Sequence, residues 1–146
     1  MAIERIVAAL DGSEGSERTL PIVRQLATGL KVPVTVVHVR EIALFPEVGG
    51  QPRRVDEDEL SARISQQAAD LKNDGIDVEL QIVESTYRGG PAHEIVGVAK
   101  QVGAGLIVTG SRGYGVIQGL LVGSVAHRLQ HIAPCPVLIV PPPPDA

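Results

Sequence analysis

The sequence predicts an α/β fold: an open, parallel sheet of five strands in the order 3-2-1-4-5, with helices on both faces. Short runs of apolar and β-branched residues alternate with longer segments of helical spacing, a pattern typical of parallel sheets. Most of the short runs are continuously apolar, as expected of strands buried on both faces. Residues 76–84 instead alternate apolar and polar side chains, which is typical of an edge strand. An edge strand in mid-sequence and right-handed crossovers favour the stated order.

The first strand is expected in residues 3–10, where a mostly apolar run precedes a turn. A helix over residues 14–30 follows, because apolar residues recur there at helical spacing. Ser13 or Ser16 can cap its amino end. Pro21 should kink this helix or shorten its regular part, since proline removes one internal hydrogen bond.

A second strand is expected at residues 33–39, a buried run rich in β-branched residues. The polar, glycine- and proline-rich loop at 41–55 is long for a compact domain, so a mobile lid and a disordered segment both fit it. The next helix spans 56–73 and begins with the acidic cluster at 56–59. That cluster suits the positive helix end and solvent rather than a metal ion, because adjacent helical residues do not face each other.

The second half of the chain continues the alternation of strand and helix. Gly90-Pro91 opens the third helix, since proline suits the first helical position, and Gly103 ends it. The remaining elements are a strand at 105–109, a glycine-rich loop at 110–123, a helix at 124–132 and a strand at 137–140. We therefore expect a single domain over residues 1–140, with a proline-rich tail at 141–146 outside the fold.

Composition excludes several classes of function. The chain has 146 residues, of which 44% are apolar, and so favours one globular domain with an aliphatic core. A net charge of −4, no basic run longer than Arg53-Arg54 and 2% aromatic residues argue against a nucleic-acid partner. The single Cys135 excludes an internal disulfide framework and is expected to be a small buried residue. The amino-terminal apolar run is too short for a signal peptide or membrane span, which favours a cytoplasmic protein without a membrane partner.

The predicted strand order places a ligand crevice between strands 1 and 4, where the chain reverses its direction across the sheet. The carboxyl end of strand 1 is Leu10-Asp11-Gly12, and that of strand 4 is Thr109-Gly110. Ligands of open α/β sheets bind outside the carboxyl ends of strands at such a point. Asp11 and the glycine-rich loop should therefore face one crevice, although about 100 residues separate them.

The loop differs from two common phosphate-binding patterns. The Walker pattern is absent, and the dinucleotide pattern GxGxxG is only approached by Gly113, Gly115 and Gly119. The pattern present is Gly110-x-x-Gly113, then nine residues, then Gly123-Ser124. Glycines permit positive φ and let backbone N–H groups approach phosphate oxygens, and a helix amino end attracts anions. The residues expected to hold phosphate are Gly110, Arg112, Gly113, Gly123, Ser124, Val125 and Ala126.

This pattern resembles the universal stress protein family, in the subgroup that binds ATP, whose loop reads G-x2-G-x9-G-[ST]. All four positions match in spacing and type. The resemblance covers nearly the whole chain and includes the segments IVAALDGS, VVHV, GGPAHEI, LIVTGSRG, LLVGSVAHRL and APCPVLIVP. It implies a Rossmann-like fold similar to that of the adenine nucleotide alpha hydrolases, and ATP with Mg²⁺ or Mn²⁺ as the ligand.

The same resemblance implies the adenosine side of the site. Asp11 would contact the ribose or a bound Mg²⁺, and Val39 would meet the adenine through its main chain. Ala9 and Thr109 would line the pocket. Family members frequently have proline near position 9 and methionine or a similar apolar residue at 109, so the departures fall on this side.

Simpler structural interpretations remain open for these residues. The loop glycines can be turn glycines in a protein that binds nothing, and Ser124 or Asp11 can cap a helix. His38 lies in an apolar strand and is expected to be a satisfied core histidine rather than a catalytic one. His127 and His131 lie four residues apart but lack the further ligands of a zinc site.

The function that follows is a nucleotide-dependent sensor or adaptor in a stress response, with an unidentified protein partner. Hydrolysis would be slow at most, because the loop contains no obvious general base and no Walker lysine. The alternatives are a nucleotide-free dimeric scaffold of the same fold and an ATPase or adenylyl-transferring enzyme. The apolar edge strand at 137–140 favours a homodimer in the first two cases. ATP, ADP and a cyclic nucleotide all remain candidates for the ligand.

Overall fold

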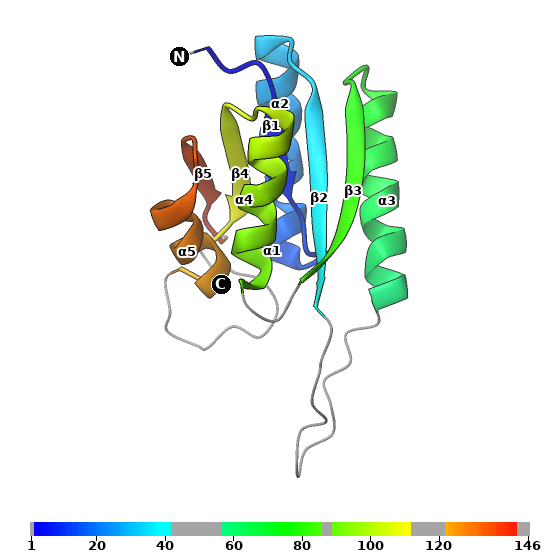
Figure 1. Ribbon diagram of the computed structural model, residues 1–146. Coiled ribbons are helices and arrows are strands. Elements are labelled where there is room, and N and C mark those ends of the chain that lie inside the picture. The colour runs from blue at the N-terminus through cyan, green and yellow to red at the C-terminus, as the bar shows by residue number, and fades with distance from the viewer. Residues whose placement is uncertain (1, 42–56, 86–88, 112–121, 143–146) are drawn as a thin grey trace.

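The structure is a computed structural model that describes residues 2–41, 57–85, 89–111 and 122–142 (Figure 1). Its strands form one parallel sheet of five strands in the order β3-β2-β1-β4-β5, which confirms the predicted fold class. The elements are β1 (Ile6–Ala9), α1 (Glu14–Glu17), α2 (Thr19–Leu30), β2 (Val34–Glu41), α3 (Glu57–Asn73), β3 (Val78–Ser85), α4 (Gly90–Val102), β4 (Leu106–Gly110), α5 (Ser124–Ile132) and β5 (Val137–Val140).

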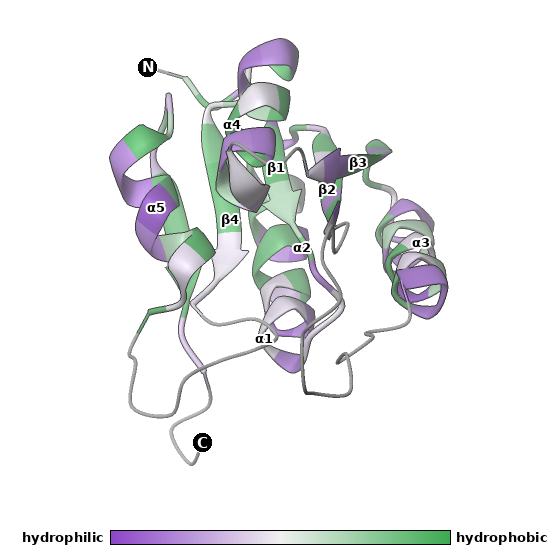
Figure 2. Cartoon of the chain, turned by 60° about the horizontal axis from the view of Figure 1, so that its bottom comes forward, coloured by the Kyte–Doolittle hydropathy of each residue, from purple (hydrophilic) through white to green (hydrophobic). Residues whose placement is uncertain are grey.

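The sheet separates two apolar cores. Side chains alternate along β1, so that Ile6 and Ala8 face the core under α2 and α3, whereas Val7 and Ala9 face the core under α4 and α5. All four of these residues are buried, as the continuous apolar run predicts. Figure 2 shows the hydrophilic residues of α3 on the side turned away from the sheet.

The expected helix over residues 14–30 consists of two helices, α1 and α2, which meet at Arg18. Pro21 is the third residue of α2 and has no N–H to bond the carbonyl of Glu17, so regular hydrogen bonding is interrupted there. This confirms the expected effect of Pro21. Ser13 caps α1 by accepting a hydrogen bond from the Ser16 N–H at 3.1 Å.

The edge strands of the sheet are β3 and β5, as predicted from the sequence. The β2–β3 ladder runs from Val34 opposite Val78 to Glu41 opposite Ser85, so β2 extends one residue into the expected loop. Strand β3 is an edge strand, and its Ile82 side chain is exposed. The rest of the loop expected at 41–55, and with it the question of a lid, lies outside the described residues, as do residues 143–146 of the tail.

The carboxyl ends of the parallel strands lie together at one edge of the sheet, at the bottom in Figure 1 and turned toward the viewer in Figure 2. Residues 10–13, here called the Asp11 loop, follow β1 at this carboxyl edge, and Ser111 follows β4. In the described part of the chain, no helix is both long enough and apolar enough to cross a membrane.

Candidate functional site

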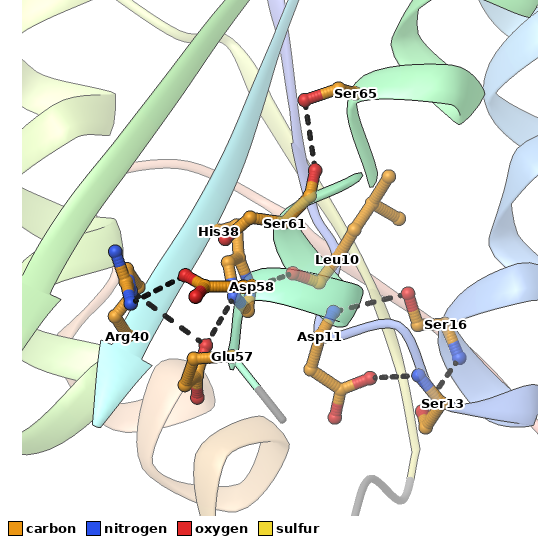
Figure 3. A network of polar contacts seen from close by, with 10 residues as sticks. All are labelled: Leu10, Asp11, Ser13, Ser16, His38, Arg40, Glu57, Asp58, Ser61 and Ser65. Atoms are coloured by element: carbon orange, nitrogen blue, oxygen red, sulfur yellow. Dashed lines mark hydrogen bonds and ion pairs between the residues drawn. The ribbon is translucent and has the colours of Figure 1, made fainter. Parts of the chain in front are cut away.

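The carboxylate of Asp11 uses one oxygen to shape its own loop. Its Oδ1 accepts a hydrogen bond from the Ser13 N–H at 2.9 Å, and its backbone N–H donates to Ser16 Oγ at 3.1 Å (Figure 3). Ser13, not Asp11, caps the helix, so the capping alternative for Asp11 is wrong. Within the described residues, Oδ2 accepts no hydrogen bond. Asp11 is half-buried and retains one oxygen for a ligand.

One carboxylate oxygen at this position fits the role of an Mg²⁺ contact. Magnesium is usually held by one or two carboxylates together with the phosphates of the substrate, rather than by a complete protein cage. Among the described residues, no group of three histidine, cysteine, aspartate or glutamate side chains can hold a metal ion. His127 and His131 have ring centroids 5.0 Å apart and form an edge-to-face pair.

His38 is a satisfied core histidine, as the sequence predicts. Its side chain is buried, with Nδ1 lying 3.0 Å from the Leu10 carbonyl oxygen and Nε2 lying 3.0 Å from Glu57 Oε2 (Figure 3). Glu57 also lies 4.0 Å from Arg40, which approaches Asp58 at 3.5 Å. Glu57 lies in the first turn of α3, as expected of the acidic cluster at 56–59, and it has a second role that was not expected, the contact to His38.

The residues expected on the adenosine side come together at the ends of β1, β2 and β4. Ala9 pairs with Val37 of β2, and Ala8 pairs with Val108 of β4, the residue before Thr109. Ala9 and Val39 both contribute to the core under α4 and α5. Ala9 and Thr109 are buried and Val39 is half-buried, so Val39 offers the most side-chain surface of the three.

Gly110 has a packing role, which differs from the role expected of it. Its φ is not positive, so the expectation of a left-handed conformation is wrong. A Cβ at this position would lie 3.0 Å from both the carbonyl carbon and the oxygen of Gly15. Glycine at 110 therefore lets the end of β4 approach the backbone of α1. Gly113 and Arg112 lie outside the described residues.

Gly123 also departs from expectation. It has an extended backbone, with φ −70° and ψ 166°, and it is the N-cap of α5, so the alternative that Ser124 is the cap is wrong. Its N–H donates to the Ser111 carbonyl and is not available to a phosphate. Ser111 in turn donates its N–H to the Val140 carbonyl at 2.9 Å. These bonds hold the start of α5 next to the end of β4.

The amino end of α5 presents the expected phosphate-binding groups. The His127 N–H bonds back to the Gly123 carbonyl at 2.9 Å, the first such bond in this helix. Helical geometry leaves the preceding N–H groups of Ser124, Val125 and Ala126 without a partner inside the helix. The Ser124 side chain is exposed, and the positive end of the helix dipole favours an anion here.

Sequence reasoning missed the residues that support the Asp11 loop from α3. Arg63 donates from Nη1 to the Gly12 carbonyl oxygen at 2.8 Å, and Glu57 holds His38. The signal in the sequence is weak: the two residues are six positions apart on one predicted helix face, among other charged residues. Nothing in that pattern indicates which backbone carbonyl each one reaches.

Comparisons with known proteins identify the family and agree with the fold. The model of the universal stress protein family matches residues 2–141. Universal stress protein YxiE of Bacillus subtilis is 31% identical over an alignment of 144 residues, which covers 93% of this chain and 97% of the relative. A family member from Burkholderia pseudomallei superposes with a TM-score of 0.73 at 26% identity, over 97% of this chain and 98% of that one. A universal stress protein from Archaeoglobus fulgidus, solved in complex with dAMP, superposes with a TM-score of 0.65 at 29% identity. The match covers 96% of this chain and 99% of that one.

Proposed function

The chain belongs to the universal stress protein family, and on that premise we propose that it binds an adenine nucleotide, ATP first among them, at the carboxyl edge between β1 and β4. The nucleotide would act as the signal of a sensor or adaptor in a stress response. The observation that carries this proposal is the bond from the Gly123 N–H to the Ser111 carbonyl. It fixes the open N–H groups of α5 at the same edge of the sheet as the Asp11 carboxylate.

The division of the ligand between these groups follows from their chemistry. The N–H groups of Ser124, Val125 and Ala126, with the Ser124 hydroxyl, suit the phosphates. Asp11 Oδ2 suits a ribose hydroxyl, or an Mg²⁺ or Mn²⁺ ion carried by the phosphates, which would neutralise part of their charge. The relative solved with dAMP supports an adenine nucleotide as the ligand class.

The proposed role is binding rather than rapid turnover. His38 and Glu57 form a ready acid–base pair, but they satisfy each other on the α3 side of the sheet. Asp11 Oδ1 accepts the hydrogen bond from the Ser13 N–H, and Oδ2 is the oxygen proposed for the ribose or the metal ion, so neither oxygen is left to remove a proton from water. We expect at most slow hydrolysis, with the bound nucleotide changing a surface that a partner protein recognises.

Titration calorimetry with ATP, ADP, AMP and cAMP, each with and without Mg²⁺, tests the proposal directly. We expect saturable binding of at least one of these nucleotides well below millimolar concentration. Asp11→Asn is the informative variant, because the Ser13 bond fixes Oδ1 and leaves an NH₂ donor where Oδ2 was. Absence of binding by the wild type at millimolar nucleotide would refute the proposal.

One observation favours a dimeric scaffold as the second candidate. Strand β5 is the other edge of the sheet, and its Leu138 side chain is 38% exposed. An apolar edge strand of this kind pairs readily with its own copy in a two-fold dimer. Sedimentation at micromolar concentration tests the dimer, and a melting temperature that does not change with Mg-ATP would favour the scaffold over the sensor.

A further inference from the structure

The residues on either side of Asp11, Leu10 and Gly12, both have their carbonyl oxygen hydrogen-bonded by a side chain. His38 Nδ1 binds the Leu10 carbonyl at 3.0 Å, and Arg63 Nη1 binds the Gly12 carbonyl at 2.8 Å. The backbone N–H of Asp11 is held by Ser16. The position of the Asp11 backbone is therefore set by contacts on both sides of the residue as well as at the residue itself.

These contacts converge on one face of α3. Glu57 holds His38, Leu60 packs on Gly12, and Arg63 binds the Gly12 carbonyl. The three α3 residues are spaced three apart and so share one side of the helix. A Cβ on Gly12 would lie 2.6 Å from Leu60 Cδ2, so the helix and the Asp11 loop are in close contact. The first two turns of α3 support the loop at three points.

Both ring nitrogens of His38 form a hydrogen bond. A carbonyl oxygen only accepts, so the Leu10 contact places a proton on Nδ1, and the contact to Glu57 requires another between Nε2 and Oε2. The His38 side chain is 2% exposed and that of Glu57 is 25% exposed. Loss of either partner would leave a polar atom of the other without its hydrogen bond in a largely buried place, which is costly.

We propose that Arg63, and Glu57 acting through His38, are positioning residues for Asp11, which make nucleotide affinity depend on how the amino end of α3 packs against the Asp11 loop. This inference rests on the proposed function, since it requires Asp11 to contact the nucleotide. Coupling of this kind is reciprocal: a nucleotide that holds Asp11 also stabilises the first turns of α3. The structure thus identifies α3 as an element that can respond to the ligand.

A double-mutant cycle between Arg63 and Asp11 tests the inference. Arg63→Ala removes one hydrogen bond to the loop and should weaken nucleotide binding about fivefold, which corresponds to about 1 kcal/mol. In the Asp11→Asn background the same change should have almost no effect, because the group that it positions is gone. Arg63→Lys can still donate to the Gly12 carbonyl and should restore most of the affinity.

Arg24→Ala is the matched control. Its side chain is 42% exposed, against 45% for Arg63, and it forms an ion pair with Asp74 rather than with the Asp11 loop. This variant should bind nucleotide as the wild type does. Thermal unfolding without nucleotide shows that each variant is folded, and two such exposed arginines are expected to be replaced without loss of the fold.

The hydrogen bonds of His38 to Leu10 and to Glu57 are tested with variants that each keep one of the two. His38→Asn places an amide N–H near Nδ1 and should keep the Leu10 bond, whereas His38→Gln places it near Nε2 and should not. Affinity should therefore be higher in the first variant. Glu57→Gln should retain affinity that Glu57→Ala loses, because its amide still hydrogen-bonds His38.

The outcomes separate this inference from the proposed function. If Asp11→Asn leaves nucleotide affinity unchanged, the proposed role of Asp11 in binding is wrong. If Asp11→Asn weakens binding but the Arg63→Ala loss is absent, or is additive with it, the positioning role is wrong and the proposed function stands. Coupled losses support both.

Discussion

Replacement of Gly12 by alanine should destabilise the protein through two separable effects. Gly12 has φ +80°, a conformation that costs a residue with a Cβ about 1–2 kcal/mol. The new Cβ would also lie 2.6 Å from Leu60 Cδ2, which must turn away at about 0.5–1.5 kcal/mol for an off-rotamer side chain. We expect a total loss of about 2–3 kcal/mol and a melting temperature lower by about 5–10 °C.

Two other glycines isolate these effects. Gly75 has φ +87° with no atom within 4 Å of an added Cβ, so Gly75→Ala measures the cost of positive φ alone. Both variants change the entropy of the unfolded chain equally, so that contribution cancels in their difference. Gly29 lies in α2, its φ is not positive, and no atom lies within 4 Å of an added Cβ. Gly29→Ala should therefore stabilise the protein by about 0.5–1 kcal/mol.

Urea unfolding of the three variants, followed by circular dichroism, gives the free energies. Gly12→Ala should lose more than Gly75→Ala, and truncation of Leu60 to alanine should remove that difference in a double-mutant cycle. If Gly12→Ala lowers the free energy of unfolding no more than Gly75→Ala does, the inference that α3 packs closely on the Asp11 loop is wrong. The positioning role of α3 would then lose its main steric support.

Three further variants or reactions test local features. Lys31 has φ 56° at the end of α2, so Lys31→Gly should raise the free energy of unfolding by up to about 1 kcal/mol, measured in urea. Ser13→Ala should lower it by about 1 kcal/mol, because the cap of α1 and its bond from Ser16 are lost; an unchanged midpoint would contradict this. Burial raises the pKa of the Cys135 thiol, so alkylation by iodoacetamide should be slower in the native than in the unfolded chain and should accelerate as the pH rises.

The fold was predictable because each helix and strand is indicated by the periodicity and the turn residues of its own segment of sequence. The alternation in residues 76–84 identified an edge strand, and Pro21 marked where α1 gives way to α2. The polar contacts of the site were not predictable in the same way. Glu57 reaches His38 across 19 residues of sequence, and the helical pattern contains no information on that pairing. Cys135 was expected to be buried but is only half-buried. Its position between two prolines in the sequence contains little information on how its side chain packs.

The glycine pattern of the loop has a packing role beside the proposed role in binding. A Cβ at position 110 would lie 3.0 Å from the backbone of Gly15, so glycine is favoured there even in a relative that keeps this fold but binds no nucleotide. The bond from the Gly123 N–H to Ser111, by contrast, needs only a backbone N–H and an extended backbone, which any residue except proline can supply. The pattern alone therefore does not separate a sensor from a scaffold. The features that do are the N–H groups at the start of α5 and the Asp11 oxygen that the loop leaves unused, so variants at Asp11 are more informative about function than variants at Gly110.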